Sequence, residues 1–400
     1  DKINLLTREN LTGIRVIRAL NKEDFEEKKF VKANNELTKT DLSIVKVMQL
    51  QTPIMLLIFN GTSLLAIWVG IARLGMDISY LGKMMAFMQY ATQVIMSFLF
   101  LTMLFVMIPR ANVSAKRINE VLTTESEIQF PDEMTEEPTV EASVEFRHVD
   151  FRYGKSEGKV LENISFKAEA GKTTAFIGST GSGKSTLINL VPRFFDATAG
   201  EILISGVDIK KYPEATLMKR ICYVPQKGYL FAGTVRSNIL FGVNEGSIES
   251  MKKAAKIAQA AEFINKMPEK YESKIAEGGT NVSGGQRQRL SIARALAKEP
   301  EILIFDDAFS ALDMKTDSKL REALKAVTQN TVTLIVAQRI STIRDAEQII
   351  VLDRGKIVGK GSHYELLDKC KVYLEIAKSQ LSDDEIAREL RISKEKAGRK

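Results

Sequence analysis

Cysteine is scarce in this chain of 400 residues, which contains only Cys222 and Cys370, far apart in the sequence. This count excludes a disulfide framework and a cysteine-based zinc site. A secretory signal peptide is also missing, and the chain opens on Asp1-Lys2 without an initiator methionine. We therefore expect the chain to be a fragment whose N-terminal part is missing.

A strong charge imbalance is missing too, because 57 basic and 50 acidic residues leave a net charge of only +7. Such a mild basic excess is weak support for a nucleic-acid partner, and we expect none. The cytoplasmic surface of a membrane explains it equally well. The length predicts two to three domains.

Charge almost disappears from two long stretches of the chain. Residues 48–74 carry only Arg73, and residues 84–108 carry no charged side chain. Because about 20 apolar residues cross the hydrocarbon core of a bilayer, we predict membrane helices at about residues 42–74 and 79–109. A loop around Gly75-Met76-Asp77 joins them. The alternative is a pair of buried soluble helices, in which charge-free runs of this length are rare.

The charges beside these runs predict their orientation. The loop between the runs holds only Arg73 and Lys83, whereas basic residues gather outside them, at Lys28, Lys29, Lys32, Lys39, Lys46, Arg110, Lys116 and Arg117. Lysine and arginine favour the cytoplasmic side, so both ends of the hairpin are expected there. A helix from Ile78 to Leu122 would be about 65 Å long, about twice the thickness of the core, and would project into the cytoplasm.

Polar side chains recur at four-residue spacing within the second run, at Gln89, Gln93 and Ser97, and seven of the 14 methionines lie between Met76 and Met107. Polar groups within a membrane usually face the interior of a helix bundle, and methionine offers an adaptable apolar surface. These residues are consistent with the wall of a cavity for amphipathic solutes. Ordinary helix packing explains them as well.

The remainder of the chain changes character at residue 123. Residues 123–142 are acidic, contain Pro131 and Pro138, and show no periodicity, which predicts a linker. From residue 143 to about 380, short β-like runs alternate with helical stretches, as a parallel α/β sheet requires. The charged residues 381–400 predict an exposed helix or a frayed tail.

The clearest motif reads G-x-x-x-x-G-K-[ST]. An apolar β-prone run, 173–177, precedes it, and a helical pattern follows, which is the context a P-loop needs. We predict that its residues bind phosphate through backbone N–H groups, with Lys184 reaching the β- and γ-phosphates and Ser185 binding Mg²⁺. The nucleotide-binding residues are Gly178, Ser179, Thr180, Gly181, Ser182, Gly183, Lys184, Ser185 and Thr186.

Two further elements carry phosphate chemistry. The apolar run 302–305 ends in Asp306, the position at which P-loop proteins hold Mg²⁺. A Ser-Gly-Gly sequence at 283–285 begins a helical stretch and offers a second anion site. Two phosphate-binding loops in one domain indicate a nucleotide sandwiched between two domains that pack head to tail.

Together these elements resemble the C-terminal part of an ABC exporter half, and the similarity covers residues 1–380. It implies an α-helical transmembrane segment of the type 1 exporter fold over residues 1–122, followed by an α/β P-loop NTPase domain of ABC type over residues 143–380. The cofactors it implies are ATP and Mg²⁺. Four membrane helices that precede these two in the family are missing here.

The resemblance assigns further residues of this chain's own nucleotide site. Tyr153 stands where the family stacks an aromatic ring on adenine. Gln226, which follows Val-Pro, matches the loop that contacts Mg²⁺ and senses the membrane domain. Residues 9–25 resemble the segment that leads into a coupling helix.

Other residues are assigned to the site of a partner subunit. Residues 282–286 match the family's signature motif, with Val282 in place of the usual leucine. Residues 310–313, which end at Asp313, match the loop that crosses to the partner. The residues expected to contact nucleotide from this side are Ser283, Gly284, Gly285, Gln286 and Asp313.

Two positions depart from the family pattern. Asp307 stands where the family has the glutamate that polarises water, and Gln338 stands where it has histidine. Aspartate is one methylene shorter, and glutamine carries no positive charge. Displacing a catalytic group by about 1 Å can cost about 10²-fold in rate, so we expect ATP binding with slow hydrolysis.

Because a head-to-tail pair shares its sites, this chain would have a poor site of its own and give the partner a near-consensus signature motif. The resemblance therefore implies one subunit of a heterodimeric multidrug-type exporter in the cell membrane, with its nucleotide-binding domain in the cytoplasm. The partners implied are a second exporter half, the lipid bilayer and amphipathic cargo. The alternatives are a homodimeric exporter of lipid or peptide, an ATP-binding regulatory or gated subunit, and a soluble ABC ATPase.

Overall fold

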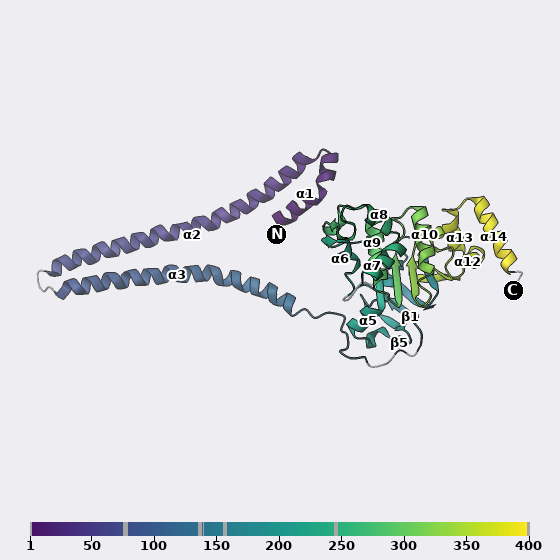
Figure 1. Cartoon of the computed structure of the whole chain (residues 1–400). Helices are drawn as coiled ribbons and strands as arrows, with labels where there is room; N and C mark the ends of the chain where they lie inside the picture. Colours follow the sequence, from purple (N-terminus) through teal and green to yellow (C-terminus); the bar gives the residue numbers. More distant parts are fainter. Residues whose placement is uncertain are drawn as a thin grey trace. The chain divides into compact units, whose positions relative to one another are not determined.

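The computed structural model describes residues 2–74, 79–134, 138, 140–154, 158–243 and 247–397. The chain divides into two compact units, Asp1–Glu125 and Ser126–Lys400. The first unit is helical, and the second combines helices with strands (Figure 1). The predicted loop at Gly75-Met76-Asp77 lies outside the described residues.

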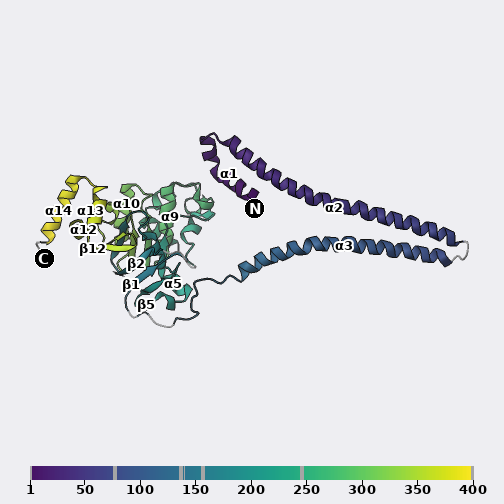
Figure 2. The same cartoon turned by 180° about the vertical axis from the view of Figure 1, so that it is seen from behind.

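The first unit consists of α1 (Lys2–Ala19), α2 (Glu23–Leu74) and α3 (Ser79–Leu122). Figures 1 and 2 both show α2 and α3 side by side. Gln51 Nε2 donates to Thr102 Oγ1 across this pair at 2.9 Å. A side chain at Gly70 would collide with the Met84 sulfur. These two contacts are in the register of an antiparallel hairpin.

Both long helices exceed the length needed to cross a bilayer. By length and composition, Glu23–Ile71 and Leu81–Leu122 qualify as candidate membrane spans of 49 and 42 residues. Since about 20 residues suffice, each helix has room for polar ends. Large apolar side chains of these helices are exposed, including Leu57, Trp68 and Phe105. Such side chains can contact lipid or other membrane helices.

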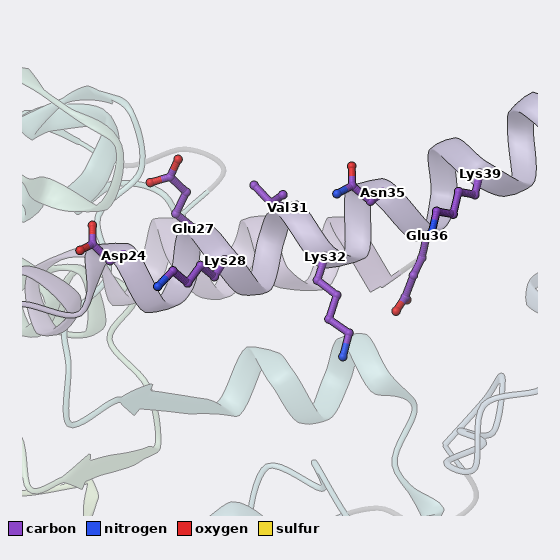
Figure 3. A pocket seen from close by; sticks show the side chains of 8 residues that line it. All are labelled: Asp24, Glu27, Lys28, Val31, Lys32, Asn35, Glu36 and Lys39. Atoms are coloured by element: carbon purple, nitrogen blue, oxygen red, sulfur yellow. The ribbon is translucent and has the colours of Figure 1, made fainter.

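The N-terminal part of α2 is polar and packs against α1. Lys2 pairs with Glu36 at 3.0 Å, and Lys29 pairs with Glu9 at 3.4 Å. The two helices are separated by a turn at residues 20–22, within the segment expected to lead into a coupling helix, and that role stays a prediction. Figure 3 shows the side chains that line a hollow on α2, most of them charged and of both signs: Asp24, Glu27, Lys28, Val31, Lys32, Asn35, Glu36 and Lys39.

The second unit is organised around a six-stranded sheet in the order β12-β11-β3-β10-β9-β6. Neighbouring strands from β11 to β6 are parallel, and β12 is antiparallel to β11. The strands are β3 (Thr173–Gly178), β6 (Ile221–Val224), β9 (Ile302–Asp306), β10 (Val332–Val336), β11 (Gln348–Asp353) and β12 (Lys356–Gly361). All residues of β9 and β10 are buried, which explains their continuous apolar sequence.

A second, antiparallel sheet has the order β2-β1-β4-β5. It consists of β1 (Ser143–Phe151), β2 (Leu161–Glu169), β4 (Ala199–Ile204) and β5 (Val207–Asp208), and a short pair, β7 (Gly233–Thr234) and β8 (Lys274–Ile275), lies apart from it. The helices are α4 (Lys184–Leu190), α5 (Glu214–Arg220), α6 (Val235–Ile239), α7 (Ile248–Ile257), α8 (Ala261–Lys266), α9 (Gly284–Ala297), α10 (Met314–Lys325), α11 (Ile340–Ile343), α12 (His363–Lys369), α13 (Lys371–Lys378) and α14 (Asp383–Ala397).

Two apolar clusters cover the two faces of the six-stranded sheet. Leu303 and Phe305 belong to one cluster, while Ile302 and Ile304 belong to the other. Alternation of this kind follows from the period of two along a strand. Fixed on both faces, the strands hold the loops at their carboxyl ends in place.

The stretch expected to be a linker contains no helix or strand among its described residues, and part of it is docked. Arg193 donates to the carbonyl of Gln129 at 3.0 Å and lies over the ring of Phe130 at 4.5 Å. Phe130 and Met134 pack against the core. The domain limits at 122, 142 and 380 stay predictions, although α3 ends at Leu122 and β1 begins at Ser143.

The charged C-terminal segment forms the helix α14 (Figure 2), and a buried polar cluster docks this helix on the domain. His363 contacts Tyr373 through Nδ1 at 2.6 Å and Glu389 through Nε2 at 2.5 Å. Burial lowers the pKa of His363 although Glu389 opposes the shift, which favours the neutral ring. Its Nε2–H then donates to Glu389, and Arg344 binds the same carboxylate at 2.9 Å.

We predict that Glu389→Ala loosens α14, because it leaves the buried His363 N–H and the Arg344 guanidinium without their acceptor. An unsatisfied buried donor costs about 1–3 kcal/mol. Hydrogen exchange of residues 383–397 in the full chain should accelerate by about fivefold or more. Arg391→Ala, at an exposed position of α14, is the control and should leave exchange unchanged. Equal exchange in both variants would contradict this account of the docking.

Candidate functional site

The loops that carry the predicted site residues meet at one edge of the six-stranded sheet. They follow β3, β6, β9 and β10, whose parallel pairing places all four carboxyl ends together. Ligands of open α/β sheets bind in this position. The structure thus brings together the P-loop, Gln226, Asp306, Asp307 and Gln338.

Glycine is required at specific points of the P-loop, residues 178–186. Gly183 has φ of 98° and precedes α4, and a Cβ there would lie 2.8 Å from Leu161 Cδ2. A Cβ on Gly178 would overlap the carbonyl oxygen of Leu352. Gly181 has φ of 80° in open space. The bare backbone therefore leaves a cradle in which N–H groups can approach phosphate oxygens.

Lys184 is folded over this loop. Its Nζ donates to the carbonyl oxygens of Gly178 at 2.9 Å and Ser179 at 2.7 Å, and to Ser182 Oγ at 3.3 Å. Burial lowers the pKa of Lys184, and the charges of Asp307 and Asp306 oppose that shift. The ammonium group is therefore held beside the phosphate cradle and can pair with phosphate oxygens.

Both oxygens of the Asp306 carboxylate accept a hydrogen bond from a hydroxyl group. Ser185 Oγ donates to Oδ1 at 2.9 Å, and Tyr223 OH donates to Oδ2 at 2.9 Å. Asp306 is only 8% exposed. Hydroxyl and carboxylate are thus fixed side by side at the mouth of the P-loop.

The Ser185–Asp306 geometry fits Mg²⁺. Two ligand oxygens at adjacent corners of an octahedron with bonds of about 2.1 Å lie about 3.0 Å apart, and Ser185 Oγ and Asp306 Oδ1 are 2.9 Å apart. Gln226, whose amide nitrogen donates to the adjacent Asp307, stays a predicted ligand. Among the described residues, no cluster of three or more His, Cys, Asp or Glu side chains is placed to hold a metal. The site thus suits an ion that takes its other ligands from phosphate and water.

Asp307 lies beside Asp306 and is engaged by two amides. Gln226 Nε2 and Gln338 Nε2 both donate to its Oδ2, at 3.0 Å and 2.8 Å. Its backbone has φ of 48°, and its N–H donates to the carbonyl of Val336. Burial raises the pKa of Asp307, and the hydrogen bond from Gln226 opposes that shift. The two departures from the family pattern are therefore in direct contact.

Tyr153 adjoins the P-loop through its hydroxyl group, which lies 3.0 Å from Thr186 Oγ1. Its ring makes edge contacts with Phe151 and Phe195 at centroid distances of 4.8 and 5.2 Å, and 41% of the residue is exposed. An exposed aromatic ring at this position can stack on a base.

The Ser-Gly-Gly segment forms the start of α9. Ser283 Oγ accepts from the Gln286 N–H, and Gln286 Oε1 accepts from the Ser283 N–H, which completes a capping box. A Cβ on Gly285 would lie 3.3 Å from the Ala311 carbonyl oxygen, whereas Gly284 has open space. In the described part of the chain, neither Ser283 nor Gln286 shares a hydrogen bond with Lys184, Ser185, Asp306 or Asp307. Asp313 caps α10 through the Thr316 N–H.

Sequence reasoning missed two residues of the site, Tyr223 and Gln288. The Gln288 side chain, which is 2% exposed, donates to the Pro225 carbonyl at 3.0 Å and accepts from the Gly228 N–H at 2.9 Å. It therefore ties the loop of Gln226 to α9, the helix that Ser283 caps. Its polarity on a helix face that is otherwise buried was the only signal in the sequence.

Comparison with known proteins identifies the family. The ABC transporter profile matches residues 161–310, and the ABC transporter transmembrane region profile matches residues 1–98. A solved bacterial Atm1-family ABC exporter with ATP bound superposes with a TM-score of 0.85 at 30% identity, over 96% of this chain and 67% of that chain. The chain belongs to the ABC transporter family. Its fold, a helical transmembrane region followed by an α/β ATP-binding domain, is of the exporter type, as predicted.

Relatives of this ABC transporter chain come from several bacteria. An uncharacterized ABC transporter ATP-binding protein of Mycobacterium bovis is 42% identical over 385 residues, 95% of this chain and 66% of the relative. An ATP-dependent lipid A-core flippase of Syntrophus aciditrophicus is 36% identical over 389 residues, 97% of this chain and 64% of the flippase. The chain thus spans about two thirds of the length of these relatives.

We predict that Gly183→Ala abolishes the phosphate cradle of this ABC domain. The added Cβ meets Leu161 and requires an unfavourable positive φ, so binding of an ATP analogue to the full chain should weaken at least tenfold. Gly158→Ala is the matched control, because its Cβ enters open space outside the site, and it should change the dissociation constant by less than twofold. Equal affinities in both variants would refute the assignment.

Gln288→Leu is predicted to free the loop at residues 225–228 without unfolding the domain. The substitution leaves the Gly228 N–H and the Pro225 carbonyl without their partner, at a cost of about 1–3 kcal/mol. Hydrogen exchange of residues 225–231 should accelerate, while exchange of β9 stays slow. Gln329→Leu, at an exposed position, should alter neither. Unchanged exchange at 225–231 in Gln288→Leu would show that the bonds are dispensable.

Proposed function

We propose that this chain is one half of a dimeric, ATP-driven exporter, and that its own ATP site hydrolyses slowly. The observation that carries the proposal is the pair of hydrogen bonds that the side-chain amides of Gln226 and Gln338 donate to Asp307 Oδ2. A carboxylate oxygen that accepts from Gln226 and Gln338 has fewer lone pairs to offer an attacking water. The side chain that the family uses as a base is therefore both shorter and occupied.

The pair of substitutions weakens catalysis in two ways. Aspartate withdraws the carboxylate by about 1.5 Å, the length of one C–C bond, and a misplacement of this order can cost about 10²-fold. Gln338 can donate a hydrogen bond to the γ-phosphate but cannot become a cation. Because a positioned base contributes about 10²–10⁴-fold, slow turnover with intact binding is the expected result.

Binding of Mg-ATP is assigned to the residues around the P-loop. Backbone N–H groups of residues 178–186 and the Lys184 ammonium bind the phosphates, and Tyr153 stacks on adenine. Ser185, Asp306 and Gln226 would hold Mg²⁺, which would neutralise charge on the phosphate oxygens. By its resemblance to the family loop, Gln226 would also sense the membrane region.

The signature segment is assigned to the opposite site of the dimer. Ser283, Gly284, Gly285 and Gln286 open a 14-residue helix, whose N-terminal N–H groups favour an anion, and Asp313 approaches the same site. They would contact the nucleotide held by the P-loop of a second subunit. The chain combines an ATP site that is expected to hydrolyse slowly with a near-consensus signature motif. This combination is what one subunit of a heterodimer would need. We propose that the partner carries glutamate and histidine at the matching positions and an altered signature motif.

Transport follows from closure of the two ATP domains. ATP bound between them draws the domains together, and the coupling segment of residues 9–25 transmits this motion to the membrane helices. Hydrolysis at the competent site reopens the dimer, while the slow site keeps its nucleotide and holds the domains near each other. The chain would reside in the cell membrane as a multi-pass protein, with its ATP domain in the cytoplasm.

We propose that the cargo is amphipathic. Tyr90, Gln93, Val94, Ser97, Phe98 and Leu101 line a hollow on α3, which combines polar and apolar contacts. Gln89, expected on the same face, does not line it. The flippases among the relatives favour a lipid as the second candidate cargo, and the exposed apolar side chains of α3 suit multidrug compounds equally.

The ATP turnover of the purified native complex tests the asymmetry. Asp307→Ala is expected to leave turnover within about threefold, because the competent site is formed by the partner's P-loop. Replacing the partner's matching glutamate by glutamine should nearly abolish turnover. The opposite result, in which loss of Asp307 is the more damaging change, would refute the proposal.

A repair experiment serves as an independent control. Asp307→Glu combined with Gln338→His should raise the turnover of the chain purified alone by about tenfold or more, while Asp307→Asn should leave its slow rate within about threefold. Brisk hydrolysis by the unmodified chain alone would favour a homodimer with two working sites. ATP binding without transport of dye or lipid by the native complex would favour a regulatory subunit.

A further inference from the structure

Tyr223 contacts the predicted Mg²⁺ ligand Asp306, but none of the sequence motifs assigns it a role. It lies on β6, which pairs in parallel with β9 so that Tyr223 stands opposite Ile304. Because Ile304 and Asp306 are two residues apart, their side chains lie on the same face of the sheet. Tyr223 and Asp306 are therefore diagonal neighbours on that face.

This placement produces a direct bond. Tyr223 OH donates to Asp306 Oδ2 at 2.9 Å, while Ser185 Oγ donates to Oδ1 at 2.9 Å. The two oxygens of one carboxylate are thus held from opposite sides. Two fixed points define the plane of the carboxylate, whereas one bond would let it rotate about its Cβ–Cγ axis.

The phenol is itself held in place. Its ring makes an edge contact with Phe194 at a centroid distance of 5.7 Å and packs against the core cluster that contains Ile302 and Ile304. In the bond to Asp306 the hydroxyl group is the donor, because a carboxylate can only accept.

We propose that Tyr223 is a positioning residue that holds Oδ2 of Asp306 and so directs Oδ1 toward Ser185 and the bound Mg²⁺. This inference rests on the proposed binding of Mg-ATP at the P-loop. Tyr223 acts through the carboxylate and contacts neither nucleotide nor metal. Its loss would widen the range of orientations of Asp306 and weaken Mg²⁺-dependent binding, with little effect on the phosphate cradle.

Titration with Mg²⁺ tests this role through binding. The full chain, reconstituted in lipid nanodiscs, is saturated with a fluorescent ATP analogue in EDTA and then at increasing free Mg²⁺. Tyr223→Phe, which retains the ring and removes only the hydroxyl group, should raise the half-saturating Mg²⁺ concentration by about three- to tenfold. The dissociation constant of the analogue in EDTA should change by less than twofold.

Phe194→Leu is the matched control, because it removes the ring contact of Tyr223 and leaves its hydroxyl group, and it should shift the Mg²⁺ midpoint by less than twofold. An unshifted midpoint in Tyr223→Phe would overturn the inference. Equal weakening with and without Mg²⁺ would overturn it as well, since that result indicates a packing role. Failure of the unmodified chain to bind the analogue would instead overturn the proposed function.

Discussion

The parallel pairing of β6, β9, β10 and β3 is the constraint on which the site depends. Hydrogen bonds between neighbouring strands fix their register, and the apolar clusters on both faces prevent any strand from shifting. Four loops that are distant in sequence consequently end within hydrogen-bonding reach of one another. Lys184, Asp306, Asp307, Gln226 and Gln338 owe their proximity to this pairing.

Much of this arrangement could be predicted because short-range sequence carries it. The strand–turn–helix pattern around residues 173–190 is local, and so are the buried strand before Asp306 and the charge-free membrane runs. The register between strands is different, because it depends on packing between residues about 80 positions apart. The contact between Tyr223 and Asp306 could therefore not be predicted from the sequence. It becomes evident once the pairing of β6 with β9 is known.

The C-terminal helix shows a second limit of sequence reasoning. Residues 381–400 are highly charged, which is typical of an exposed or frayed segment, yet α14 is docked through Glu389. The buried partner His363 lies 26 residues earlier, where the sequence offers no hint of a contact. Burial of a charged side chain becomes predictable only when the groups that compensate its charge are known.

The backbone at position 307 adds a consequence for how this site could change over time. Its φ of 48° belongs to the left-handed region, which aspartate and asparagine tolerate better than most residues that carry a Cβ. The choice of residue at position 307 therefore affects both the backbone conformation and the acid–base chemistry of the site. Aspartate therefore meets little steric resistance here, whereas a longer acid at this position would adopt a backbone conformation that it favours less. In the proposed pair of unlike subunits, this preference would help aspartate to persist at position 307.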